Sequence, residues 1–202
     1  ACTMSENTVH GIFMEGPDAE ADIRGSEIHL NGRNGILVQR KSSVSLLDTA
    51  VNENESSGLS FNGEGSFGEV TRSYALRNRR HGVYFGNGAD GWIEESRLDQ
   101  KFEAGILAGN QGTKIRVIRN TVTRNQFGIV VQTGAQGEIL ANDASGNENA
   151  GIGIYSDGSQ ATVSDNTLEN NRTYGLDRTG DNTLNILQEN AYKGNLQGDE
   201  RL

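Results

Sequence analysis

The chain has 202 residues, which is long enough for one large domain with a core of its own. Its 18 Lys and Arg residues against 27 Asp and Glu residues give a net charge of −9, and an acidic chain is a poor match for nucleic acid, whose phosphates attract basic surfaces. The sequence has no run of about 18 apolar residues, which excludes a membrane-spanning helix, and its one cysteine, Cys2, excludes an internal disulfide and a cysteine metal site.

A repeat of 23 or 24 residues organises the chain. A glycine followed by an aliphatic residue marks each copy, at Gly11-Ile12, Gly35-Ile36, Gly58-Leu59, Gly82-Val83, Gly105-Ile106, Gly128-Ile129, Gly151-Ile152 and Gly175-Leu176. Self-similarity at such a period is typical of stacked supersecondary units. We therefore expect a solenoid, with the abundant glycine serving its turns.

In chain order, residues 1–24 are expected to form a lead-in and a partial first coil, residues 25–197 the solenoid, and residues 198–202 a charged tail. Within the solenoid, three columns of apolar residues alternate with polar neighbours, as in half-buried strands. The columns are Ile23, Leu46, Val70, Ile93, Val117, Ile139 and Val163; then Ile28, Val51, Ala75, Leu98, Val122, Ala144, Leu168 and Leu187; then Ile36, Leu59, Val83, Ile106, Ile129, Ile152 and Leu176. The predicted fold is all-β: a single-stranded right-handed parallel β-helix of about eight coils of 22–24 residues, with three short strands per coil.

Two polar columns are as regular as the apolar ones. The first holds Ser26, Thr49, Ser73, Ser96, Asn120, Asn142 and Asn166, and the second holds Asn31, Asn54, Asn78, Lys101, Asn125, Asn147 and Asn171, continued outward by Asn7 and Asn190. Stacked amides can hydrogen-bond along the axis and satisfy the backbone at a corner. We interpret these columns as structural ladders.

A basic segment, RNRRHGVY, runs from Arg77 to Tyr84 and supplies the candidate catalytic residues. Its arginines could hold a carboxylate, His81 or Tyr84 could move the proton of the adjacent acidic carbon, and Arg80 could stabilise the enediolate. In the alternative interpretation, the arginines of this segment are solvated turn residues that pair with carboxylates on adjacent coils, namely Glu53, Glu55 or Glu103.

The only tryptophan, Trp92, is expected on the outer surface, with Tyr84 just across a glycine-rich turn. Sugars bind such surfaces by stacking on rings and by hydrogen bonds to carboxylates and guanidinium groups. The candidate substrate-binding residues are Trp92, Arg116, Glu94, Glu69 and Arg79. In the alternative interpretation, Trp92 covers the turn and the charges form a salt-bridged stripe.

Almost the whole chain resembles the right-handed parallel β-helix repeat proteins, a carbohydrate-associated group that includes mannuronan C5-epimerases, NosD-like proteins and pectate-lyase-like enzymes. Residues 49–85 resemble the epimerase module most, and its Arg-His-Gly step falls on Arg80-His81-Gly82. The Asp-Pro-His-(Asp/Glu) motif of that module is missing, since the corresponding place reads Leu37-Val38-Gln39-Arg40. The resemblance implies an acidic polysaccharide as ligand and, if the protein is an enzyme, a polysaccharide lyase or C5-epimerase acting on uronates.

We therefore expect a β-helical domain that binds or processes a uronate-containing polysaccharide on its outer face. A non-catalytic structural or adhesive segment of a larger extracellular protein is the alternative. No cofactor is expected, and no motif indicates Ca²⁺, although the ion is compatible with the fold. A secreted, periplasmic or cell-surface location is expected, as is homo-oligomeric or end-to-end packing through uncapped coils.

Overall fold

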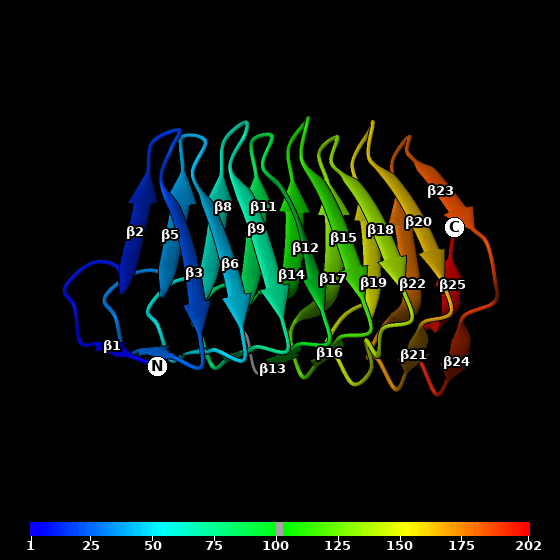
Figure 1. Cartoon of the computed structure of the whole chain (residues 1–202). Coiled ribbons are helices and arrows are strands. Elements are labelled where there is room, and N and C mark those ends of the chain that lie inside the picture. Colours follow the sequence, from blue (N-terminus) through cyan, green and yellow to red (C-terminus); the bar gives the residue numbers. More distant parts are fainter. Residues whose placement is uncertain (100–102) are drawn as a thin grey trace.

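The computed structural model describes residues 1–99 and 103–202, which form a rod of stacked coils (Figure 1). Successive coils contribute strands to three parallel sheets, A, B and C. In the described residues, sheet A contains β1 (Thr3–Ser5), β4 (Glu27–His29), β7 (Ala50–Asn52), β10 (Tyr74–Leu76), β13 (Arg97–Asp99) and β16 (Thr121–Thr123), and then β21 (Thr167–Glu169) and β24 (Ala191–Lys193). Sheet B contains β2 (Ile12–Glu15), β5 (Ile36–Gln39), β8 (Leu59–Asn62), β11 (Val83–Gly86), β14 (Ala104–Gly109), β17 (Phe127–Gln132), β19 (Ile152–Tyr155), β22 (Tyr174–Thr179) and β25 (Gly198–Arg201). Sheet C contains β3 (Glu20–Arg24), β6 (Ser43–Leu47), β9 (Phe67–Thr71), β12 (Asp90–Glu94), β15 (Lys114–Ile118), β18 (Gln136–Leu140), β20 (Gln160–Ser164) and β23 (Thr183–Ile186).

The all-β solenoid with three sheets is confirmed, but the coil count is about nine rather than eight. In the described residues sheet B has nine strands. The ninth is β25, formed by the segment that was expected to be a tail, and it pairs with β22 through Tyr174 and Gly198. The 24-residue spacing persists there although the Gly-aliphatic step is lost, because Asp199 and Glu200 stand in the places of Gly175 and Leu176.

Sheets B and C lie face to face with their strands running in opposite directions, and sheet A closes one side of the rod (Figure 1). The predicted inward columns form one continuous buried core. Leu187 is an exception, because it is 70% exposed and Tyr192 takes the place opposite Leu168 instead. Phe61 and Phe85 stack at 4.6 Å between ring centroids in the middle of this core.

The polar columns form two hydrogen-bonded ladders at the corners on either side of sheet A. In the first, each backbone N–H from Ser26 to Asn166 donates to the side chain of the equivalent residue one coil on, ending at Asn190. In the second, the same bond links Asn7, Asn31, Asn54 and Asn78, and then Asn125, Asn147, Asn171 and Asn195. Lys101 lies outside the described residues. Asn190 therefore belongs to the first ladder and not to the second as predicted. It lies 24 residues after Asn166 and accepts from the backbone N–H of that residue.

Both corners bend through a left-handed residue. With the exception of Glu189 before Asn190, the residue before each ladder position described above has a positive φ, for example Asp48 at 50° before Thr49 and Glu53 at 55° before Asn54. Such backbone is unfavourable for a residue with a Cβ, and the ladder bonds that follow hold it in place. The corners are tight and repetitive, so the outer faces of the sheets remain for function.

Candidate functional site

The structure places the candidate residues on two faces that point away from each other. His81 precedes β11, which carries Tyr84 on the outer side of sheet B, whereas Trp92 and Glu94 lie on β12 of sheet C. Since sheets B and C pack face to face (Figure 1), their outer sides are the opposite walls of the rod. The expected aromatic patch of Tyr84 and Trp92 across one turn is therefore wrong.

On sheet B, the carboxylate of Glu103 joins two of the candidate catalytic residues. Arg80 donates from Nε to Glu103 Oε1 at 3.1 Å and from Nη2 to Oε2 at 3.4 Å. His81 Nε2 lies 3.0 Å from Glu103 Oε2, and the imidazole is only 6% exposed. The sequence indicated Glu103 only as one of several partners for the arginines. The repeat pattern did not predict its contact with His81.

Both nitrogens of His81 are engaged. The backbone N–H of Ala104 donates to Nδ1 at 3.3 Å, so in the neutral ring the hydrogen lies on Nε2 and points at Glu103. Burial lowers the pKa of His81 to about 4, and the positive charge of Arg80 acts in the same direction, while the negative charge of Glu103 opposes the change. His81 is therefore a neutral donor to Glu103 at neutral pH, with no free lone pair.

Two side chains at the position equivalent to His81 in other coils make the same kind of hydrogen bond. His10 accepts at Nδ1 from the N–H of Asn34 at 3.3 Å, and Asn34 accepts at Oδ1 from the N–H of Ser57 at 3.1 Å. His10, Asn34 and His81, which each precede a Gly-aliphatic step, thus accept from a backbone N–H one coil on. Within this column, the Nδ1 contact of His81 is structural, and its contact with Glu103 is what distinguishes it.

Tyr84 lies beside His81 with their rings 5.9 Å apart and nearly parallel. Its phenol reaches over Gly86, where an added Cβ would fall 2.0 Å from the hydroxyl oxygen. Burial raises the pKa of Tyr84, and the charge of Arg80 partly offsets this. The hydroxyl therefore stays protonated and presents a donor to the outer face.

These side chains border a hollow of about 530 Å³ on the outer face of sheet B. Its lining is almost entirely polar and comes from several adjacent coils: Asn34, Ser56, Ser57, Ser60, Asn62, Arg80, His81, Tyr84, Glu103, Leu107 and Gln132. Hydroxyls, amides, one guanidinium and one carboxylate converge here around an aromatic ring. We call this hollow the sheet B site.

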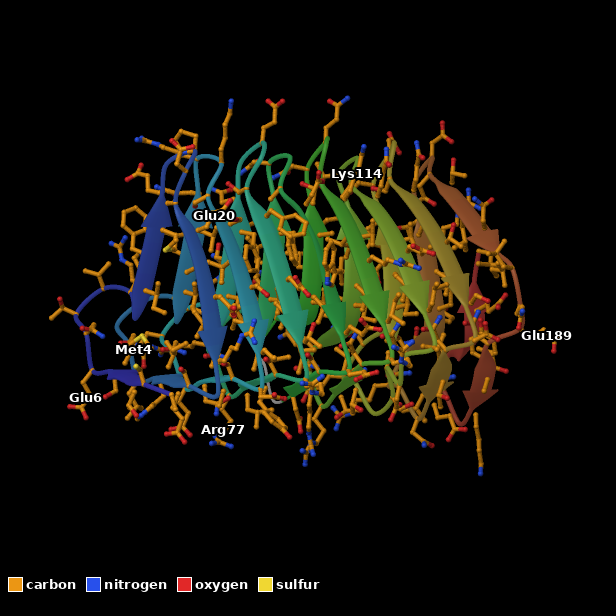
Figure 2. The ribbon with its side chains drawn as sticks, viewed as in Figure 1. Met4, Glu6, Glu20, Arg77, Lys114 and Glu189 are labelled. Atoms are coloured by element: carbon orange, nitrogen blue, oxygen red, sulfur yellow. The ribbon has the colours of Figure 1, made fainter. Side chains whose placement is uncertain are left out.

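The other arginines of the basic segment stand outside the sheet B site. Arg77 pairs with Glu53 and Arg79 pairs with Glu55, each one coil away and exposed. Figure 2 shows Arg77 pointing away from the rod at the corner after β10, while Glu20 and Lys114 stand at the edge where the strands of sheet C begin. The alternative interpretation of these arginines as paired turn residues matches their geometry.

On sheet C, Trp92 is 38% exposed and meets Phe67 edge to face, with centroids 4.9 Å apart. Arg116 pairs with Glu138 at 2.9 Å and Glu94 pairs with Arg119. Ser45 donates to Glu69 at 3.4 Å. The four predicted binding residues of this face are thus neighbours of one another, but not of His81.

A second cluster on sheet B surrounds Asp177, and no pattern in the sequence indicated it. This carboxylate is 5% exposed and accepts from Tyr155 at 2.9 Å and from Arg201 at 2.6 and 2.8 Å. Arg201 also lies over the ring of Tyr174, 4.9 Å from its centroid. The sequence predicts a tail at Arg201, so its ion pair with Asp177, which links β25 to β22, was not expected.

Neither a metal-binding cluster nor a helix able to span a membrane is found within residues 1–99 and 103–202. No group of three or more His, Cys, Asp and Glu residues in that part of the chain could hold a metal ion. The same part contains no helix of the length and apolarity that crossing a membrane requires.

The fold is similar to that of several solved structures. The A-module of the Azotobacter vinelandii mannuronan C-5 epimerase AlgE4 is 16% identical, with a TM-score of 0.77 over 98% of this chain and 62% of that one. Pectate lyase Pel9A is 18% identical, with a TM-score of 0.68 over 89% and 55% of the two chains, and a mutant of the periplasmic alginate epimerase AlgG is 15% identical, with a TM-score of 0.75 over 91% and 47%.

The chain thus spans between 47% and 62% of the length of these three structures. No curated protein matches the sequence. The family model described as "Right handed beta helix region" matches residues 1–122 and 65–199. The chain therefore belongs to the right-handed β-helix family.

Proposed function

We propose that the protein binds an acidic, uronate-containing polysaccharide at the sheet B site. The observation that carries the proposal is the polar hollow of about 530 Å³ that gathers Arg80 and Tyr84 among hydroxyl and amide side chains. A guanidinium suits the carboxylate of a sugar acid, the polar groups suit its hydroxyls, and the aromatic ring suits its C–H face. The names of the similar structures, mannuronan and alginate epimerases and a pectate lyase, support an acidic polysaccharide.

Arg80 retains donors for such a ligand. A guanidinium has five N–H groups, and Glu103 accepts from Nε and Nη2 only. The Arg80 side chain is 58% exposed, so a carboxylate can approach its remaining N–H groups from solvent. The contact with Glu103 also fixes the direction of the guanidinium, which lowers the entropy lost on binding.

The same geometry favours binding over proton transfer. A general base needs a lone pair within reach of the proton that it removes. In His81 one nitrogen accepts from Ala104 and the other carries a hydrogen directed at Glu103, while Tyr84 is kept protonated by burial, which raises its pKa. We therefore propose binding as the function, with lyase or C5-epimerase chemistry as the second candidate.

Calorimetric titration with a uronate hexasaccharide tests the proposal. We expect saturable binding that Arg80→Gln weakens at least about tenfold, since a hydrogen bond to a charged group is worth about 1.5–3 kcal/mol. Arg77→Gln is the matched control, because Arg77 is similarly exposed and also pairs with a glutamate one coil away, outside the hollow. Equal affinities of the two variants, or no uronate binding at all, would overturn the proposal and favour a structural solenoid.

The same mixtures decide between binding and turnover. A lyase would generate the ultraviolet absorbance of an unsaturated uronate, and an epimerase would change the proton NMR spectrum of polymannuronate. We expect neither change over a long incubation with wild-type protein. The structural similarity to the periplasmic alginate epimerase AlgG also supports a secreted, periplasmic or cell-surface location.

A further inference from the structure

The outer face of sheet C carries an aromatic pair that the sheet B site does not use. Trp92 on β12 is 38% exposed, and Phe67 on the neighbouring β9 supports it edge to face at 4.9 Å. A partly exposed indole held by a second ring is a rigid apolar platform. The flat C–H face of a pyranose ring can stack on such a platform.

The charge of this face differs from that of the sheet B site. Outward positions on the described strands of sheet C carry six carboxylates and three cations: Glu20, Asp22, Glu69, Asp90, Glu94 and Glu138 against Arg24, Lys114 and Arg116. Two of the cations are already paired on the face, Arg24 with Asp22 and Arg116 with Glu138. An acidic polysaccharide would be repelled here, whereas the hydroxyls of a neutral sugar can donate to the carboxylates.

Hydrogen-bond acceptors continue in line from the platform. The strand register aligns Trp92 with Glu69, Glu69 with Ser45, and Ser45 with Asp22. At about 4.8 Å per strand this column covers about 14 Å, which accommodates a short oligosaccharide along the axis. A hollow of about 430 Å³ lies at its far end, bordered by Phe67, Ser45 and Asp22 among others.

From this arrangement we infer that the outer face of sheet C is a second glycan-binding surface, and that it takes a neutral sugar chain. One pyranose ring stacks on Trp92, and the next rings run over Glu69 and Ser45 towards Asp22. Their hydroxyls donate to the two carboxylates. The surface is independent of the uronate site, because it lies on the opposite wall of the rod.

The single tryptophan of the chain makes the test direct. Tryptophan emission and its quenching by acrylamide are followed while neutral hexasaccharides of glucose, mannose and xylose, and a uronate hexasaccharide, are added separately. We expect at least one neutral hexasaccharide to shift the emission of Trp92 and to lower the quenching constant about twofold, because a stacked ring covers the indole. The uronate hexasaccharide should leave both signals unchanged.

Variants supply the second arm, followed by calorimetry. Trp92→Ala should weaken neutral-glycan binding about tenfold, and Arg80→Gln should not affect it. Tyr74→Ala is the control, because Tyr74 is an aromatic residue of sheet A that is 50% exposed. The inference is overturned if no neutral hexasaccharide changes the emission, if uronate changes it as strongly, or if Trp92→Ala binds like Tyr74→Ala.

Discussion

Removal of one ladder amide tests how far the corners stabilise the rod. Asn54 is 1% exposed, and its Oδ1 accepts from the backbone N–H and the Nδ2 of Asn31 at 3.1 and 2.9 Å. Its Nδ2 donates to Ile28 O at 3.3 Å and to Asn78 Oδ1 at 2.8 Å. Asn54→Ala deletes these four bonds and leaves the buried N–H of Asn31 without its acceptor.

The expected loss follows from these contacts. An unsatisfied buried donor costs about 1–3 kcal/mol and each other lost bond about 1 kcal/mol or less, so we expect the free energy of unfolding to fall by about 3–4 kcal/mol. Urea unfolding followed by circular dichroism measures the change, and Asn185→Ala on the exposed end of β23 is the control, expected within about 0.5 kcal/mol of wild type. Hydrogen exchange should also accelerate at the Asn31 amide. A loss below about 1 kcal/mol for Asn54→Ala would refute the assignment of the ladder as a main source of stability.

Two further predictions concern the core and the imidazole of the sheet B site. Because burial lowers the pKa of His81 from 6.5 to about 4, unfolding takes up a proton in this range, so wild-type stability should be complete above about pH 6.5 and fall towards pH 4, by at most about 3 kcal/mol. His81→Asn, which can still accept from Ala104, should flatten that slope in unfolding titrations; equal slopes would contradict the argument. Gly91→Ala would place a Cβ 2.1 Å from the Gly68 carbonyl oxygen and 2.5 Å from the Phe85 ring, so it should destabilise by about 3 kcal/mol or more. Gly109→Ala, with its nearest atoms at 4.0 Å, should be nearly neutral, and similar unfolding midpoints for the two would show that sheets B and C are not tightly packed.

The fold could be predicted because a solenoid repeats one physical solution. Apolar residues at a constant spacing fix which side chains point inward, and the parallel register then follows coil by coil, as for Val83 beside Leu59 and Ile106. The errors fall where the repeat changes its residues and keeps its length. Tyr192 replaces an aliphatic residue, Asn195 continues a ladder, and β25 lacks the Gly-aliphatic step. A prediction based on residue types therefore assigns these positions wrongly, although the backbone keeps the 24-residue register.

The candidate site was only partly predictable. The approach of Arg80, His81 and Tyr84 follows from their closeness in the chain. The carboxylate between Arg80 and His81 comes from the next coil, and the side of the rod on which Trp92 stands depends on how sheets B and C pack. Neither the Glu103 contact nor the side of Trp92 can be predicted from the local sequence, because a turn of a few residues can join two sheet faces that point in opposite directions.

The ladders also change how a conspicuous residue in such a fold should be interpreted. His81 attracts attention as a histidine beside arginines, yet its Nδ1 contact is the one that His10 and Asn34 make in their own coils. The stacking of coils does not require the contact of His81 Nε2 with Glu103, nor the contact of the Arg80 guanidinium with the same carboxylate. In a solenoid each position is constrained first by its column, so a functional role is best sought in the bonds that a side chain makes beyond those of its column. By that criterion Arg80 and Glu103, rather than the histidine, are the residues on which we propose that uronate binding depends.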